Sequence, residues 1–348
     1  NKIIKLNVSK QPCSTGAFYA AITQMLGYKY DSDEWKVMAL SAHTKLSEKS
    51  KQYIKVFEEA TAFGGISPLL KNEFFNTDQQ REKFLTTSKL REMLDCPNSI
   101  DKRDSLEIRS WQMNVAAAMQ KFISDYTFKA IEEISEKHNS KRENICLSGG
   151  FFMNCVFNGE LEKSNLYKNV FISQSPADLG NSIGSAMYVE HVIFKNNKNN
   201  YKQKLFTGAK AEVNISEKLD KYQINYKKYL DINTLVEDIV SYLLKNKILA
   251  IYNGNSEFGE RALGARSIIS LANKNENKSI INNKIKYRED YRPFAPVCLQ
   301  NNAHKYFEVD KNYQCNSMEK VVRIRKEYLD KLPAIAHFDN SARLQTID

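Results

Sequence analysis

The sequence predicts an α/β domain followed by an α+β domain, and three observations support this fold class. Residues 144–195 read strand, helix, strand, helix, which is the alternation of an α/β layer. Residues 194–204, FKNNKNNYKQK, are polar and Asn-rich without an apolar period, as expected of a linker. Beyond them the pattern changes to isolated elements and long loops. We therefore place a domain boundary at residue 205, between domains 1–204 and 205–348.

The elements follow from hydrophobic periodicity. Apolar residues spaced by three or four predict a long amphipathic helix over 105–138, and short apolar runs predict strands. After the long helix we expect a strand at 144–147, a helix at 151–163, a strand at 169–174, a helix at 180–195, a helix at 232–244, a strand at 248–252 and a loop-rich stretch at 254–296.

Composition limits the class of protein. The 348 residues are 42% hydrophobic and 26% charged, which suits a soluble globular protein. No run approaches the roughly 18 to 20 apolar residues that span a bilayer, and residues 1–5 show no signal peptide, so we expect a cytoplasmic protein without a membrane partner. The net charge of +10 is interspersed with Asp and Glu. Nucleic acid is therefore not the expected partner, and a phosphate-bearing small ligand explains the charge as well.

Two glycine-containing turns follow the first two predicted strands. Gly149 and Gly150 stand between a strand and a helix, where missing β-carbons let backbone amides approach a phosphate or ribose. The turn with Asp178 and Gly180 follows the next strand in the same way. Together they predict a ligand cleft at one edge of the sheet, as in sugar kinases or other actin-like nucleotide-binding folds. The alternatives are a simple Gly-Gly turn and a helix-capping role for Asp178.

Two basic segments mark the second domain. The run EFGERALGARS places Arg261 and Arg266 beside glycines. The run KIKYREDYRPFAP holds Lys286 and Arg292 among aromatic residues, and its two prolines restrict the backbone that follows Arg292. Guanidinium groups bind phosphate-like oxygens through paired hydrogen bonds, so this pattern suits a compact anion. A solvated basic surface and a nucleic-acid groove remain as alternatives.

Taken together, the motifs resemble the ATP-dependent O-carbamoyltransferases of antibiotic tailoring and nodulation-factor synthesis. The motifs that carry the resemblance occur in order: CSTGAFY with TQMLGY, EWKVMAL, residues 117–120, LSGGFFMN, PADLGNSIGSA, EFGERALGARS, KIKYREDYRPFAP and HFDNSARLQT. The resemblance implies a partial actin-like domain followed by a partial YrdC-like domain. It also implies that carbamoyl phosphate and ATP give carbamoyl adenylate, from which the carbamoyl group passes to a hydroxyl of a small-molecule acceptor.

The resemblance also implies roles for individual residues. Those expected to hold carbamoyl phosphate and its displaced phosphate, as the catalytic set, are Arg261, Lys286, Arg292 and Arg343. Those expected at the nucleotide are Gly149, Gly150, Asn154 and Gly180. Those expected at the substrate are Glu34, Lys36, Arg266 and Ser267. Asp178 is the expected ligand of a divalent metal ion, Fe, Mn or Mg.

The chain departs from the family pattern at both ends. None of its five histidines forms the closely spaced pair that ligates metal in the family, and the chain ends before an expected Asn-Thr-Ser-Phe-Asn motif. We therefore expect the central part of a longer protein. The competing hypotheses are a threonylcarbamoyl transferase acting on tRNA and an inactive fragment with a binding role. A homodimer stays open.

Overall fold

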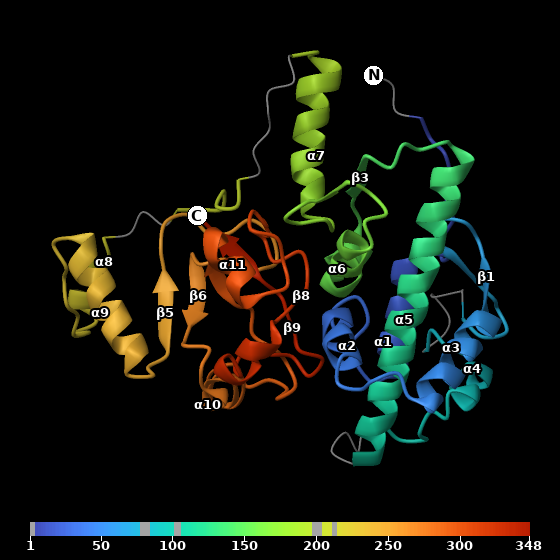
Figure 1. Ribbon diagram of the computed structural model, residues 1–348, viewed down its shortest axis with the longest axis horizontal. Helices are drawn as coiled ribbons and strands as arrows, with labels where there is room; N and C mark the ends of the chain where they lie inside the picture. Colours follow the sequence, from blue (N-terminus) through green and yellow to red (C-terminus); the bar gives the residue numbers. More distant parts are fainter. Residues whose placement is uncertain (1–3, 77–83, 101–105, 197–203, 211–213) are drawn as a thin grey trace.

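The computed structural model describes residues 4–76, 84–100, 106–196, 204–210 and 214–348 (Figure 1). Its α-helices are α1 Thr15–Met25, α2 Glu34–Ser41, α3 Glu48–Ala60, α4 Ser88–Met93, α5 Leu106–Lys137, α6 Cys155–Lys163, α7 Gly180–Tyr188, α8 Ile215–Lys221, α9 Ile232–Leu244, α10 Asn275–Ile280 and α11 Gln300–Tyr306. Its strands are β1 Thr61–Phe63, β2 Pro68–Leu70, β3 Asn144–Leu147, β4 Asn169–Ile172, β5 Leu249–Tyr252, β6 Arg266–Ile269, β7 Val297–Leu299, β8 Val322–Arg323, β9 Ser341–Ala342 and β10 Gln345–Ile347. Two 3₁₀ turns, η1 Gly150–Met153 and η4 Lys326–Lys331, and two π-helical turns, η2 Val189–Ile193 and η3 Ile281–Ile285, complete the set.

The long helix α5 is the centre of the largest hydrophobic core. It packs against α2 and α3, and its apolar stripe is buried as its periodicity predicts, including Val115, Phe122 and Ile123. Phe18 of α1 and Phe57 of α3 meet edge to face, with ring centroids 5.4 Å apart. Sequence analysis assigned no elements before residue 105, and this region holds α1 to α4. One second-half residue, Tyr291, is also part of this core.

Strands β3 and β4 form a parallel pair joined through η1 and α6, so the predicted α/β alternation is confirmed. A second, smaller core lies between this pair and its helices, where Leu147 and Ile172 of the strands meet Phe157 and Leu161 of α6. The carboxyl ends of β3 and β4 lie at one edge, followed by the two glycine turns. The parallel pairing therefore brings both turns to the same place.

Two helix boundaries differ from the prediction. The helix expected at 151–163 begins at Cys155, because the Asn154 side chain accepts a hydrogen bond from the Phe157 N–H at 3.1 Å and caps it. The helix expected at 180–195 changes to the π-helical turn η2 after Tyr188. Periodicity alone does not register such changes, because apolar spacing continues through them.

The second half holds more regular structure than predicted. The stretch 254–296, expected to be loop-rich, is mostly loop but also contains β6, α10 and η3, which the sequence pattern does not predict. Strand β6 pairs antiparallel with β5, Tyr252 standing opposite Arg266. Because β6 begins with polar residues, its own sequence does not predict a strand. Its pairing with β5 specifies the strand instead. A third core gathers Phe307, Ile324 and Leu344.

Helix α6 joins the two halves through the segment 319–321. The Val321 N–H donates to the Cys155 carbonyl at 3.0 Å, and the Asn158 side chain donates to the Glu319 carbonyl at 2.9 Å. Lys320, only 6% exposed, forms an ion pair with Glu162 of the same helix. The boundary predicted at residue 205 stays a prediction, because most of the predicted linker lies outside the described residues.

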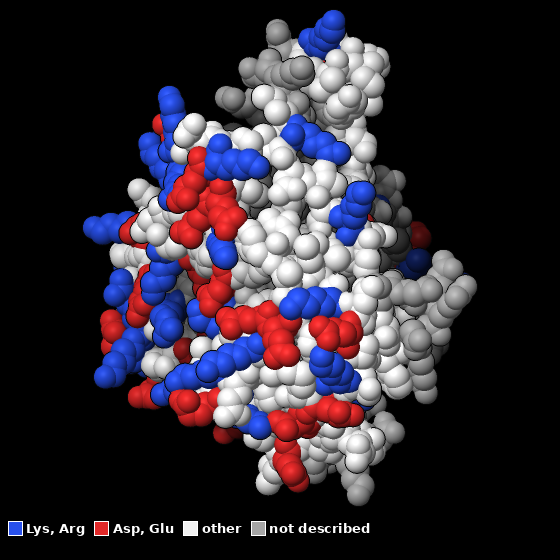
Figure 2. Space-filling view, turned by 90° about the vertical axis from the view of Figure 1, so that its right-hand side faces the viewer, with Lys and Arg blue, Asp and Glu red and all other residues white. Residues whose placement is uncertain are grey.

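Charge is mixed on the face of the molecule shown in Figure 2, where Lys and Arg lie beside Asp and Glu. The described residues of this face form no continuous basic surface of the kind that tracks a nucleic-acid backbone. Within the described residues, every helix is too short or too polar to cross a membrane.

Candidate anion-binding site

The two glycine turns touch each other. The Gly149 N–H donates to the Pro176 carbonyl at 2.7 Å, which ties the turn after β3 to the turn after β4. Gly149 adopts φ +115°, a conformation that side chains disfavour. A β-carbon at Gly149 or Gly150 would meet no described atom within 4 Å, so the backbone there faces open space. This arrangement is compatible with the approach of a nucleotide.

The other two predicted nucleotide residues have structural explanations. A β-carbon at Gly180 would overlap the Ser175 carbonyl oxygen, so close backbone packing requires this glycine. Asn154 is 7% exposed, and besides capping α6 it donates to the Gln120 side chain at 2.9 Å. Both the oxygen and the nitrogen of the Asn154 side-chain amide are therefore hydrogen-bonded within the protein.

Arg261 reaches the edge of the sheet from the second half. Its guanidinium donates to the Met153 carbonyl at 3.3 Å and, at the 3.5 Å limit, to the Gln174 carbonyl. These carbonyls belong to the segments that follow β3 and β4. Nearby, the Ser175 hydroxyl donates to the Glu260 carboxylate at 3.0 Å. The first basic loop is thus joined to the carboxyl ends of the parallel strands.

Arg343 is a further cation whose charge interacts with that of Arg261. It lies between β9 and β10, and its neighbours Ala342 and Leu344 are buried in the third core. Burial lowers the pKa of the Arg343 guanidinium, and the positive charges of Arg261 and Arg292 lower it further. No hydrogen bond or ion pair joins this guanidinium to another described residue. Arg343 is therefore a partly buried cation without a partner in the part of the chain that the structure describes.

Arg292 and Arg288 complete what we call the arginine cluster, formed by Arg261, Arg288, Arg292 and Arg343. Arg292 lies 3.7 Å above the Trp35 ring and 3.5 Å from the Glu289 carboxylate. Burial, then the charge of Arg292, lowers the pKa of Arg288 to about 10. Four cations repel one another and lose hydration, so their gathering costs stability unless an anion completes it.

The remaining predicted basic and hydroxyl residues lie differently. Lys286, at the end of η3, is exposed, and no contact links it to the arginine cluster within the described residues. Arg266 donates to the carbonyls of Asn253 and Gly254, and the Ser267 hydroxyl accepts from the Gly264 N–H at 2.9 Å. Arg266 and Ser267 thus have structural roles in the β5–β6 hairpin, and their substrate roles stay predictions.

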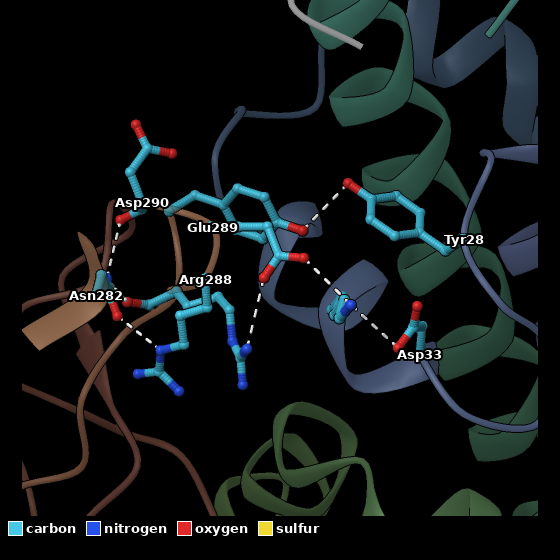
Figure 3. A network of polar contacts seen from close by, with 9 residues as sticks. Tyr28, Asp33, Asn282, Arg288, Glu289 and Asp290 are labelled. Carbon is cyan, nitrogen blue, oxygen red and sulfur yellow. Dashed lines mark hydrogen bonds and ion pairs between the residues drawn. The ribbon is translucent and has the colours of Figure 1, made fainter. Parts of the chain in front are cut away.

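The predicted substrate residues of α2 differ in their distance from the cluster. Lys36 forms ion pairs with Asp33 at 3.1 Å and with Glu289 at 3.2 Å, and it shares the Glu289 carboxylate with Arg292. Figure 3 shows Asp33 and Glu289 in this network of polar contacts. Glu34 accepts from the Asp31 N–H at 2.6 Å, and burial raises its pKa. Lys36 is therefore at the edge of the arginine cluster, whereas Glu34 closes the preceding turn.

Asp178, the predicted metal ligand, is exposed. Within the described residues, His, Cys, Asp and Glu nowhere gather in threes in a way that could hold a metal ion. A divalent ion needs several well-placed ligands, so Asp178 and its described neighbours do not by themselves fit a metal ion.

Two histidines meet where the halves touch. His43 and His337 have ring centroids 5.0 Å apart, and the Nε2 atom of His43 lies 3.1 Å from the Tyr291 carbonyl oxygen. Burial, and then the charge of His337, lowers the pKa of His43 below its ordinary value. Protonation of His43 is thus disfavoured in the folded protein.

The free energy of unfolding is therefore expected to fall on mild acidification. Below about pH 6.5 the unfolded chain takes up a proton at this position before the folded protein does, so stability present above that pH is lost as pH falls through the lowered pKa of His43. His43→Gln, which keeps a donor but does not titrate, should flatten the decline. The measurement is urea unfolding between pH 5.5 and 8; equal slopes for both proteins would contradict the assignment.

Three residues of this region, Arg288, Trp35 and Glu289, are not among the site residues predicted from the sequence. The only signal in the sequence was their position beside predicted residues, in EWK and in REDYR. Contacts between residues this far apart in the sequence can be identified only from the folded structure.

Comparison with known proteins identifies the family. A family model described as the carbamoyltransferase N-terminus matches residues 2–187, and one described as the carbamoyltransferase C-terminus matches residues 240–348. The chain belongs to the carbamoyltransferase family. The resemblance drawn from the motifs is confirmed, together with a two-part architecture of mixed α and β content. The actin-like and YrdC-like identities of the two parts stay predictions.

Relatives match nearly the whole chain. Nodulation protein NolO of Bradyrhizobium diazoefficiens is 28% identical over 96% of this chain and 57% of its own length. Nodulation protein NolNO of Sinorhizobium fredii is 27% identical over 96% of this chain and 46% of its own length. An uncharacterized protein of Synechocystis sp. is 28% identical over 97% of this chain and 57% of its own length. The chain thus spans about half the length of these relatives.

Proposed function

We propose that this chain carries the carbamoyl phosphate site of an ATP-dependent O-carbamoyltransferase. The observation that supports it most is the arginine cluster, in which Arg343 interacts with the charges of Arg261 and Arg292 and has no hydrogen-bonding or ion-pairing partner among the described residues. A phosphate dianion supplies the missing negative charge, and guanidinium groups match its oxygens with paired hydrogen bonds. Carbamoyl phosphate is the anion that fits the family.

The proposed reaction has two stages. Carbamoyl phosphate, ATP and one water give carbamoyl adenylate, pyrophosphate and phosphate; the acceptor hydroxyl then attacks the carbamoyl carbon and releases AMP. The mixed anhydride has a better leaving group than a free carbamate. Cations aimed at the departing phosphate oxygens stabilise the charge that develops on them.

Each ligand is proposed to contact a different set of described residues. Arg261, Arg292 and Arg343 hold the phosphate of carbamoyl phosphate, with Arg288 adding positive potential. The nucleotide is proposed to lie over Gly149 and Gly150, where the backbone faces open space. The link from Arg261 to the Met153 carbonyl supports a short path between the two ligands. Lys36, beside Glu289, is proposed to face the acceptor.

The family match favours this proposal over threonylcarbamoyl transfer to tRNA. Both halves match carbamoyltransferase models, which supports carbamoyl as the transferred group. Mixed charge on the face in Figure 2 gives no support to a tRNA-binding surface there.

Pyrophosphate release from ATP tests the proposal. We expect release to depend on carbamoyl phosphate and to be inhibited by inorganic phosphate in competition with it. Release that depends instead on threonine and bicarbonate would favour the tRNA-modifying alternative. Calorimetric binding of phosphate without any pyrophosphate release would favour a binding role and contradict catalysis by this chain.

A further inference from the structure

Arg292 rests on an aromatic ring contributed by the other half of the protein. Its guanidinium carbon lies 3.7 Å from the centre of the Trp35 ring, near the start of α2. Trp35 keeps 39% of its surface exposed, so it does not belong to the hydrophobic core. The ring is therefore free to act as a support for a charged group rather than as core packing.

Arg292 needs such a support. Arg343 and Arg288 both lie close enough for their charges to interact with it, and repulsion from them favours rotation of its guanidinium toward solvent. Its one carboxylate partner among the described residues, Glu289, lies at 3.5 Å and is shared with Lys36 at 3.2 Å. A shared and distant carboxylate restrains the guanidinium only weakly.

A ring restrains a guanidinium without using its hydrogen bonds. The attraction acts through the face of the planar group, and the N–H donors in its plane stay available to an anion. A second stacked arginine shows the contrast: Arg266 lies 3.5 Å from the centre of the Tyr252 ring, but its donors are bound to the Asn253 and Gly254 carbonyls. Among the described residues, the Arg292 guanidinium makes a single long hydrogen bond, to the Glu289 carboxylate at 3.5 Å.

We propose that Trp35 is a positioning residue that holds Arg292 in the arginine cluster with its donors free for the phosphate group of the substrate. Glu289 assists by joining Arg292 to Lys36, which follows Trp35 on the same helix. The inference rests on the proposed function, and it deepens that proposal by assigning a first-half residue to the phosphate site.

Tryptophan fluorescence provides a direct test with inorganic phosphate as the probe. The chain has two tryptophans, and the other, Trp111, is buried with its Nε1–H bound to the Leu94 carbonyl at 2.6 Å. Phosphate should change the emission of the unaltered chain, because the ligand alters the charge next to the Trp35 ring. The change should be absent in Trp35→Phe.

Affinity measured by calorimetry completes the test. Trp35→Leu should weaken phosphate binding about tenfold, since a partly desolvated cation–π contact is worth roughly 1 to 2 kcal/mol. Trp35→Phe keeps a ring face and should lose only about two- to threefold. In the pyrophosphate assay the same variants should raise KM for carbamoyl phosphate more than they lower kcat.

A matched control is available on β1. Phe63, 37% exposed, lies under Lys129 with the ammonium 4.4 Å from its ring centre, and Phe63→Leu should leave phosphate affinity unchanged. If Arg292→Ala abolishes binding while Trp35→Leu binds as the unaltered chain does, the positioning role is overturned and the anion site stands. If Arg292→Ala also binds normally, the anion site itself is overturned.

Discussion

Replacing Arg343 with methionine is expected to weaken binding of phosphate and carbamoyl phosphate about 30- to 1,000-fold, which corresponds to roughly 2 to 4 kcal/mol. The reason is that Arg343 has no hydrogen-bonding or ion-pairing partner among the described residues, so its donors are available to the ligand. Lysine at this position should restore only part of the affinity, because an ammonium group cannot make the paired contact. Calorimetric titration measures both.

The same substitution should leave the free energy of unfolding unchanged or raise it. Arg343→Met removes a partly buried charge that Arg261 and Arg292 repel, while the methionine keeps most of the apolar stem. Urea unfolding without phosphate measures this. Binding and stability are thus expected to respond in opposite directions, as at sites where function is maintained at the expense of stability.

A control separates this effect from the loss of one positive charge. Arg142→Met removes an arginine whose ion pair with Glu136, at 3.5 Å, lies on the surface and outside the arginine cluster, and it should not change phosphate affinity. A fall in stability of about 1 to 3 kcal/mol for Arg343→Met, with affinity retained, would instead make Arg343 a structural residue.

The substitution Gly159→Ala is expected to destabilise the protein by about 1 to 3 kcal/mol, although alanine normally favours a helix over glycine by roughly 0.5 to 1 kcal/mol. A methyl group at Gly159 of α6 would overlap the Val321 carbonyl oxygen. Because this obstacle is backbone, relief requires moving α6 away from the segment 319–321. That movement also strains the Lys320–Glu162 ion pair.

Gly184 of α7 is the matched control. It also lies inside a helix, but a β-carbon there would meet no described atom within 4 Å. Gly184→Ala should therefore stabilise the protein by about 0.5 to 1 kcal/mol. Opposite signs in chemical denaturation would support the contact between α6 and Val321, whereas stabilisation by both substitutions would exclude it.

The sequence by itself determined the α/β alternation, the long helix and the family. Each of these rests on local information: the period of apolar residues in α5, the strand–turn–helix order around Gly149, and motifs that are contiguous in the chain. The sequence did not predict strand β6, because its stability comes from pairing with β5 and not from the strand propensity of its own residues.

The composition of the proposed site depends on the tertiary structure alone. The fold brings the charges of Arg261, Arg288 and Arg292 close enough to interact with that of Arg343 and leaves Lys286 exposed, although all five are basic residues of the motifs that carry the family resemblance. A local pattern shows which residues can carry charge, but it does not show which charges face one another. That depends on contacts between distant segments, such as Trp35 with Arg292 and α6 with Val321, which form only when the two halves pack together.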